Sequence, residues 1–72
     1  VVYPNPAEEW VRIDGLTGPS TTQIIDLSGN IVLQQEDVTS ETTLDISSLT
    51  TGFYIIRWSN QIASGVEKIL IQ

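Results

Sequence analysis

The sequence predicts an all-β fold, and three observations support that prediction. Turn-forming residues recur at short intervals, at positions 4–6, 14–15, 18–19, 28–30, 51–52 and 64–65. The segments between them are as long as strands and are rich in β-branched and aromatic residues. No stretch keeps apolar residues at helical spacing for the length of a stable helix. The expected strands span residues 1–3, 9–13, 21–27, 31–36, 42–46, 53–59 and 66–71, and seven strands indicate a β-sandwich.

The first two expected strands are separated by a turn that contains Pro4 and Pro6 on either side of Asn5. A proline has no backbone donor, fixes its own φ angle and pushes the preceding residue toward extended geometry. A strand does not simply continue through such a motif. The residues alone therefore favour a structural interpretation, in which residues 4–6 form a rigid turn that blunts an edge strand.

A β-hairpin is expected next, with strands at residues 21–27 and 31–36. Its turn contains Ser28, Gly29 and Asn30, which tolerate positive φ angles, and Gly29 does so without a Cβ penalty. Replacement of Gly29 by valine is expected to disturb the hairpin. Because apolar residues occur on both faces of the two strands, alternation does not orient the hairpin, and its register stays open.

The strand expected at residues 53–59 is preceded by the pattern Leu49-x-x-Gly52-x-Tyr54. This spacing resembles the tyrosine corner of immunoglobulin-like sandwiches, in which the phenol bonds back to upstream backbone. Gly52 would allow the tight turn into the strand. A buried tyrosine with a satisfied hydroxyl explains the pattern without a ligand, so Tyr54 is interpreted as a structural residue.

Alternation along the strands predicts which side chains form the core. The residues expected inside are Val11, Ile13, Leu44, Ile46, Tyr54, Ile56, Trp58, Ile69 and Ile71. The residues expected outside are Arg12, Thr43, Asp45, Ile55, Arg57, Lys68 and Leu70. The last strand is therefore predicted to carry an exposed leucine at position 70.

The composition excludes several classes of function. Nine acidic and three basic residues give a net charge of -6, which repels phosphate backbones and anionic lipid, so no nucleic acid is expected as a partner. No apolar stretch is long enough to span a membrane as a helix, and no membrane insertion is expected. Without cysteine or histidine, the chain lacks disulfides, a Cys/His metal site and the base of a catalytic triad. We therefore expect neither an enzyme nor a cofactor.

Two further patterns give little support to a ligand. The acidic residues, including Asp26 before the hairpin turn, lack the spacing of paired catalytic carboxylates or of a calcium-binding loop. Of the two tryptophans, Trp58 lies on the predicted core face and Trp10 does not. One exposed aromatic residue is thin support for carbohydrate binding. A solvated surface explains these residues better.

Four segments, taken in order, resemble the C-terminal sorting domain, type A, of the type IX secretion system, also called the Por secretion system. They are Tyr3-Pro4-Asn5-Pro6, residues 24–32 around Gly29, Leu49-x-x-Gly52-x-Tyr54 and the terminal Lys68-Ile69-Leu70-Ile71. Their order and spacing extend over nearly the whole chain. The resemblance implies a seven-stranded, immunoglobulin-like antiparallel β-sandwich. It also implies that residues 1–72 are a single C-terminal sorting domain, a fragment of a longer secreted protein.

The resemblance implies a function as well. Such a domain directs an upstream passenger through the type IX outer-membrane translocon of Gram-negative bacteria, after transit through the periplasm. A sortase-like peptidase then removes the domain, and the passenger stays at the cell surface or is secreted. The implied partners are the secretion machinery, including the translocon and the peptidase, and the passenger domain in cis. The domain is the substrate of this processing and not its catalyst.

Residue by residue, the resemblance assigns translocon recognition to Lys68, Ile69, Leu70, Ile71 and Gln72. Physically, the strand would offer the outward Leu70 and Lys68 as an apolar and a charged contact, or its edge for pairing with a receptor strand. The family often ends with a further basic residue where this chain has Gln72. The other motif residues, which are largely structural, are Pro4, Asn5, Pro6, Gly29, Leu49, Gly52 and Tyr54.

An alternative is a fibronectin-type or immunoglobulin-like accessory module that binds carbohydrate or protein beside a catalytic domain. It explains the tyrosine corner equally well. It does not explain the proline-rich entry turn or a terminal strand that ends in Lys68-Ile69-Leu70-Ile71. A third alternative is a purely structural spacer, for which loss of the terminal strand would change stability but not location.

Overall fold

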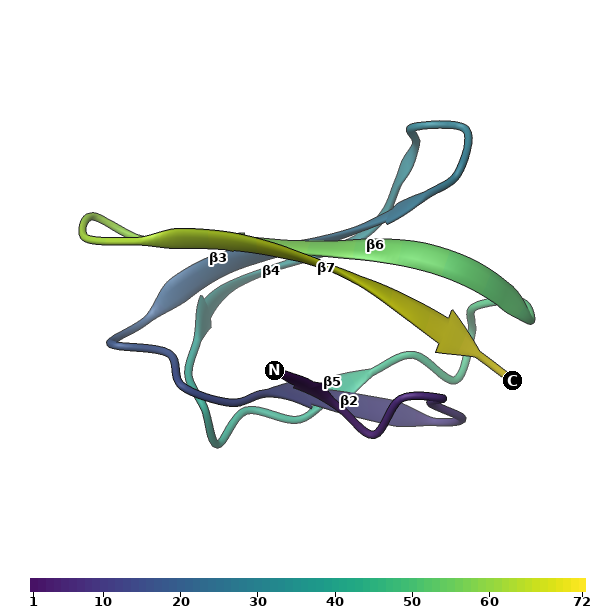
Figure 1. Ribbon diagram of the computed structural model, residues 1–72, viewed down its shortest axis with the longest axis horizontal. Helices are drawn as coiled ribbons and strands as arrows, with labels where there is room; N and C mark the ends of the chain where they lie inside the picture. The colour runs from purple at the N-terminus through teal and green to yellow at the C-terminus, as the bar shows by residue number, and fades with distance from the viewer.

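The computed structural model describes residues 1–72 and confirms the predicted all-β sandwich (Figure 1). Its strands are β1 (Val2–Tyr3), β2 (Trp10–Ile13), β3 (Ser20–Asp26), β4 (Ile31–Val38), β5 (Leu44–Asp45), β6 (Gly52–Ser59) and β7 (Ser64–Ile71). One sheet has the order β1-β2-β5, and the other has the order β4-β3-β6-β7. Paired strands are antiparallel throughout both sheets. The chain has no helix of the length and apolarity that a membrane span requires.

The strand order is that of an immunoglobulin-like sandwich in which one strand has changed sheets. In the constant-type arrangement the first, second, fourth and fifth strands share a sheet. Here β4 pairs with β3 instead, so that a sheet of three strands faces a sheet of four. The two sheets lie one above the other with the core between them (Figure 1).

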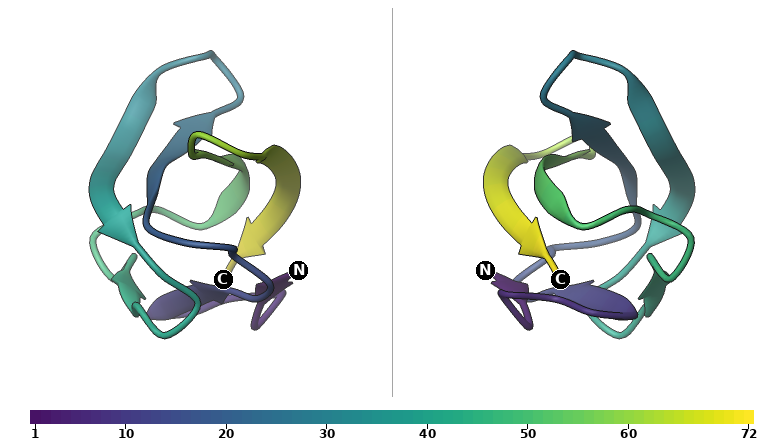
Figure 2. Two further views of the ribbon diagram at one scale, coloured as in Figure 1. Left: turned by 90° about the vertical axis from the view of Figure 1, so that its left-hand side faces the viewer. Right: turned by 90° about the vertical axis from the view of Figure 1, so that its right-hand side faces the viewer.

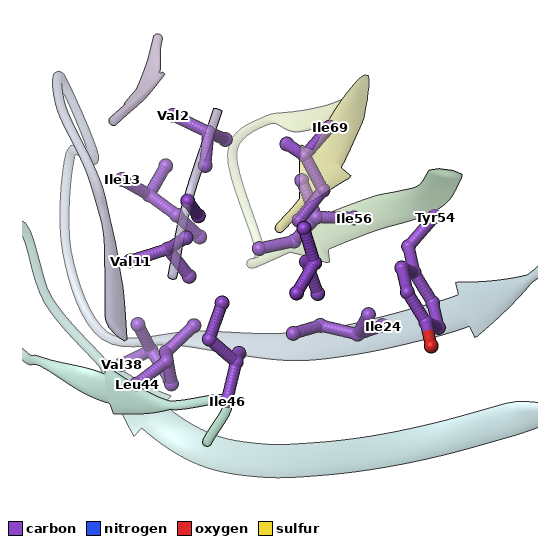
Figure 3. Close-up of a cluster of buried hydrophobic side chains, with 12 residues drawn as sticks. Val2, Val11, Ile13, Ile24, Val38, Leu44, Ile46, Tyr54, Ile56 and Ile69 are labelled. Carbon is purple, nitrogen blue, oxygen red and sulfur yellow. The ribbon is translucent and has the colours of Figure 1, made fainter. Parts of the chain in front are cut away.

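The core contains 12 buried apolar residues; ten lie on strands of the two sheets, and Ala7 and Ile46 lie just outside strands (Figure 3). Eight of the nine residues that alternation places inside belong to it, and the ninth, Trp58, is half-buried and packs against it. The residues that alternation did not identify are Val2, Ala7, Ile24 and Val38. In a domain of this size, most of the stability comes from such a cluster, because no disulfide supplements it.

The register of the β3–β4 hairpin, which the sequence leaves open, follows from the burial of one isoleucine. Ile24 is fully buried and pairs with Leu33. The next residue, Ile25, therefore points to the opposite, outer face, where it pairs with Ile31. The turn between the strands is confirmed, since Gly29 has a φ of 92°.

The side chain of Asp26 closes that turn. Its Oδ1 accepts hydrogen bonds from the backbone N–H groups of Ser28 and Asn30, each at 2.9 Å. These bonds favour the ionised carboxylate, and the one from the Asn30 backbone contributes most to lowering the pKa of Asp26. Asp26 is thus part of an Asx turn.

The β6–β7 hairpin corrects one prediction. The sequence predicts a turn at Ser64 and Gly65, but both residues begin β7, and Asn60 instead closes the turn by accepting two backbone N–H bonds at 2.8 Å. Gly65 is required for space, because it lies opposite Trp58 and any side-chain carbon there would collide with the indole ring. A strand that begins with a turn-forming residue is hard to recognise from composition.

Candidate functional site

The candidate site is the C-terminal half of β7, which lies at the edge of the four-stranded sheet. Residues 5–7 run beside this half of the strand, and the N-terminus itself lies farther from the end of β7 along the long axis of the molecule (Figure 1 and Figure 2). Ala7 forms a parallel bridge with Ile71. Its N–H donates to the carbonyl of Leu70 at 2.8 Å, and its carbonyl accepts from the N–H of Gln72 at 2.7 Å.

The side chain of Asn5 binds the same edge of β7, at Lys68 and Leu70. Its Oδ1 accepts a hydrogen bond from the N–H of Leu70 at 3.1 Å, and its Nδ2 donates to the carbonyl of Lys68 at 3.3 Å. A carboxamide has the donor and acceptor of a peptide group, so Asn5 takes the place that a neighbouring strand would occupy. The backbone groups of the edge are therefore already paired from Lys68 to Gln72.

This arrangement changes two interpretations of the sequence. Residues 4–6 do blunt an edge strand, as predicted, but the strand is β7 and not the one that leads into the turn. Pairing of the terminal strand's edge with a receptor strand was one of the two modes of recognition that the sequence suggested. In the structure Asn5 and Ala7 occupy that edge, so a receptor strand would have to displace them.

The central motif holds β7 from its other side. Gly52 pairs with Ile71 and Tyr54 pairs with Ile69, so the start of β6 lies directly beside the end of the chain. The φ of Gly52 is 152°, in a region that residues with a Cβ rarely adopt. The entry motif and the central motif thus contact opposite edges of the terminal strand.

The tyrosine corner is confirmed. The hydroxyl of Tyr54 donates to the carbonyl of Thr50 at 2.7 Å and also lies 3.1 Å from the Thr50 hydroxyl. Leu49 is half-buried against the core, and its N–H donates to the carbonyl of Ile46 at 3.0 Å. Gly29 does not take part, because it lies in the β3–β4 turn and β6 separates those strands from β7.

The two faces of β7 are different, as alternation predicts. Ile69 and Ile71 are buried in the core, whereas Lys68 and Leu70 point away from it. Lys68 is exposed, and its Nζ lies 4.7 Å from the centre of the Phe53 ring. Leu70 is half-buried and not exposed, which corrects the prediction, since the cross-strand neighbour Phe53 lies beside it.

One contact of the terminal strand was missed by the sequence analysis. The Oε2 of Glu67 accepts a hydrogen bond from the backbone N–H of Val2 at 3.0 Å, which connects β7 to the first strand of the other sheet. The signal was present, because Glu67 shares the inward parity of Ile69 and Ile71. A half-buried carboxylate at an inward position needs a donor.

The family model described as "Secretion system C-terminal sorting domain" matches residues 1–72. A search of curated proteins found no match. A solved structure of PorZ from Porphyromonas gingivalis, described as an essential bacterial surface component of the type IX secretion system, is similar with a TM-score of 0.76 and 22% sequence identity. That similarity covers 100% of this chain and 11% of the PorZ chain, and it shows a shared fold.

Proposed function

Because the chain belongs to the family of secretion system C-terminal sorting domains of type IX secretion, we propose that it directs an upstream passenger through the outer-membrane translocon. Membership of the family implies export to the cell surface or secretion. In the proposed route the passenger crosses the periplasm, the translocon recognises the folded domain, and a sortase-like peptidase then removes it upstream of Val1. Families of sorting signals are typically non-catalytic, and we assign the chain no catalytic residue.

The observation that supports this proposal is the placement of the terminal strand. Its edge is paired to Asn5 and Ala7, and its inward residues are in the core. What the C-terminal half of the strand offers a receptor is therefore the side chains of Lys68 and Leu70 on the outer face, together with the exposed Gln72. We propose that the receptor reads these groups on a rigid strand and not an extended peptide.

The accessory-module alternative is less well supported. Trp10 is 40% exposed, as a sugar-stacking residue would be. However, the guanidinium of Arg12 lies 5.5 Å from the centre of its ring, and the ring of Tyr3 meets it edge-on at 6.4 Å. These neighbours give Trp10 a packing role on the outer face of the three-stranded sheet.

The experiment is secretion of a fluorescent reporter that carries an inner-membrane signal and this chain at its C-terminus, in a host with the type IX machinery. Deletion of residues 68–72 is a poor test by itself, because it also removes Ile69 and Ile71 from the core. The double variant Lys68→Glu with Leu70→Ser changes only outward positions. A matched control is Arg12→Glu, an outward charge reversal on the other sheet.

Reporter on the surface or in the medium with the intact chain and the control, and in the periplasm with the double variant, supports the proposal. Periplasmic reporter with the intact chain contradicts it and favours the accessory module. Export that depends on the domain but survives the double variant moves recognition away from Lys68 and Leu70. Thermal unfolding of each purified domain confirms that the variants are folded.

A further inference from the structure

The outer face of the four-stranded sheet is divided into a polar half and an apolar half. One half is largely polar: Gln34, Gln23 and Arg57 lie side by side across three strands, and the exposed Val66 ends their row on β7. The Nε2 of Gln23 donates to Gln34 at 3.1 Å, and the Nε of Arg57 donates to Gln23 at 3.0 Å. This is what alternation predicts for a face that contacts water.

The other half does not follow that rule. Ile31, Ile25 and Ile55 are cross-strand neighbours, and Lys68 ends their row on β7. Phe53 precedes Ile55 by two residues on β6, so it lies on the same face, and it pairs with Leu70 of β7. Ile31 is 51% exposed and Phe53 is 47% exposed. We call this set, residues 25, 31, 53, 55, 68 and 70, the apolar outer patch.

The apolar outer patch is expensive to leave in water. Each exposed aliphatic or aromatic group forgoes burial free energy of about 25 cal/mol for every square ångström. The core does not need these side chains, because it is filled by the residues of the opposite parity. Contiguous exposed apolar surface on a small domain is typical of an interaction site.

The positive charge of Lys68 in the patch indicates the chemistry of the partner. The chain has a net charge of -6 and three basic residues, two of which, Arg57 and Lys68, lie on this face. Lys68 is the one charged residue of the patch, and it stands over the ring of Phe53. A second copy of the chain would bring another lysine and another net charge of -6, and an anionic lipid surface would meet the same repulsion.

We propose that the apolar outer patch is a docking surface for a protein partner that presents an apolar segment with a carboxylate placed to meet Lys68. This inference rests on the proposed function, because it extends the recognition surface of the terminal strand across β6, β3 and β4. Phe53 is its centre, since it contacts Lys68 and Leu70, the two residues that β7 contributes to the patch. Aromatic residues, Phe among them, are enriched at protein interfaces, and a few buried anchors carry most of the binding free energy.

The test uses the full reporter chain with Phe53→Ser, and Trp10→Ser as the matched control. Trp10 has a similar exposure, 40%, but lies on the outer face of the other sheet. We expect Phe53→Ser to lower the exported fraction about tenfold, the loss of one hot-spot contact, and Trp10→Ser to leave it within about twofold. Phe53→Leu should recover most of the export, because it keeps an apolar group there.

Each outcome decides between defined alternatives. If the unmodified chain is exported and Phe53→Ser is exported as well as Trp10→Ser, the docking surface is wrong and the proposed function stands. If the unmodified chain is not exported, the proposed function itself fails. If Phe53→Ser lowers the unfolding temperature much more than Trp10→Ser does, the export test is repeated with Ile31→Thr, a variant on strand β4 at the far side of the sheet. Normal export of a folded Ile31→Thr domain also overturns the proposal.

Discussion

The inward and outward side chains of β7 have opposite roles, although they alternate along one strand of eight residues. Ile69 and Ile71 pack into the core between the sheets, and Lys68 and Leu70 point to the outer face. The last five residues are therefore not a linear motif of five equal positions. Ile69 and Ile71 maintain the fold, and that fold positions Lys68 and Leu70 on the outer face. Deletion of the whole segment removes both pairs, so it cannot separate a loss of folding from a loss of recognition.

The largest effect is expected from truncation of an inward side chain of β7. Ile69→Ala leaves a cavity in the core and should lower the free energy of unfolding by about 2–5 kcal/mol, measured by chemical denaturation. A domain of this size has little more stability than that, so we expect export to be lost together with the fold. Ile69→Val, which should cost about 0.5–1.5 kcal/mol, is the control that keeps both. An unfolded Ile69→Ala chain that is still exported would mean that the machinery reads a linear peptide.

Gly65, near the start of β7, is a second inward position, and we expect its substitution to cause a smaller loss of stability. Gly65→Ala places a methyl group against the Trp58 ring, and such overpacking typically costs about 1–3 kcal/mol. The fluorescence of the domain should change as the indole moves. Gly18→Ala is matched, because no atom lies within 4 Å of the added carbon. Equal stability of the two variants would show that Trp58 moves aside without cost.

The edge of β7 is tested by Asn5. Asn5→Ala removes two hydrogen bonds to the strand and should lower stability by about 1–2 kcal/mol, with faster hydrogen exchange at the amide of Leu70. Asn5→Asp keeps an acceptor for that amide but loses the donor to Lys68, so the Leu70 amide should stay better protected than in the alanine variant. If Leu70 exchanges at the same rate in all three proteins, the entry motif does not hold the terminal strand in solution.

The fold was predictable from the sequence because alternation is a property of the strand backbone. Tyr54 and Ile56 were placed correctly by parity, with no knowledge of their neighbours. Parity failed for the β3–β4 hairpin, since Ile24 and Ile25 satisfy either face equally well. There, the packing of the two sheets decides the register, and that information is not local.

The site was less predictable, for the same physical reason. Asn5 reaches its partners across 63 and 65 positions of the chain, so its role appears only when the sandwich closes. The sequence showed that residues 4–6 end a strand, but not which edge they would cover. The half-burial of Leu70 also depends on Phe53, a neighbour on another strand. Glu67 is different, because its inward parity alone marked it as a residue in need of a partner.

The smallest expected change in stability, and the sharpest test of the comparison, is at Lys68. Lys68→Gln removes an exposed charge and its contact with the Phe53 ring, which should change the free energy of unfolding by less than about 1 kcal/mol. If the outward face serves recognition, export should nevertheless fall, because the carboxylate of a partner would lose its counter-charge. Lys68→Arg keeps the charge and should retain export. Stability and export should both be measured for the unmodified chain, Lys68→Gln and Lys68→Arg. A fall in export without a fall in stability assigns recognition to the outward side chains. A parallel fall in both would give Lys68 the same structural role as Ile69.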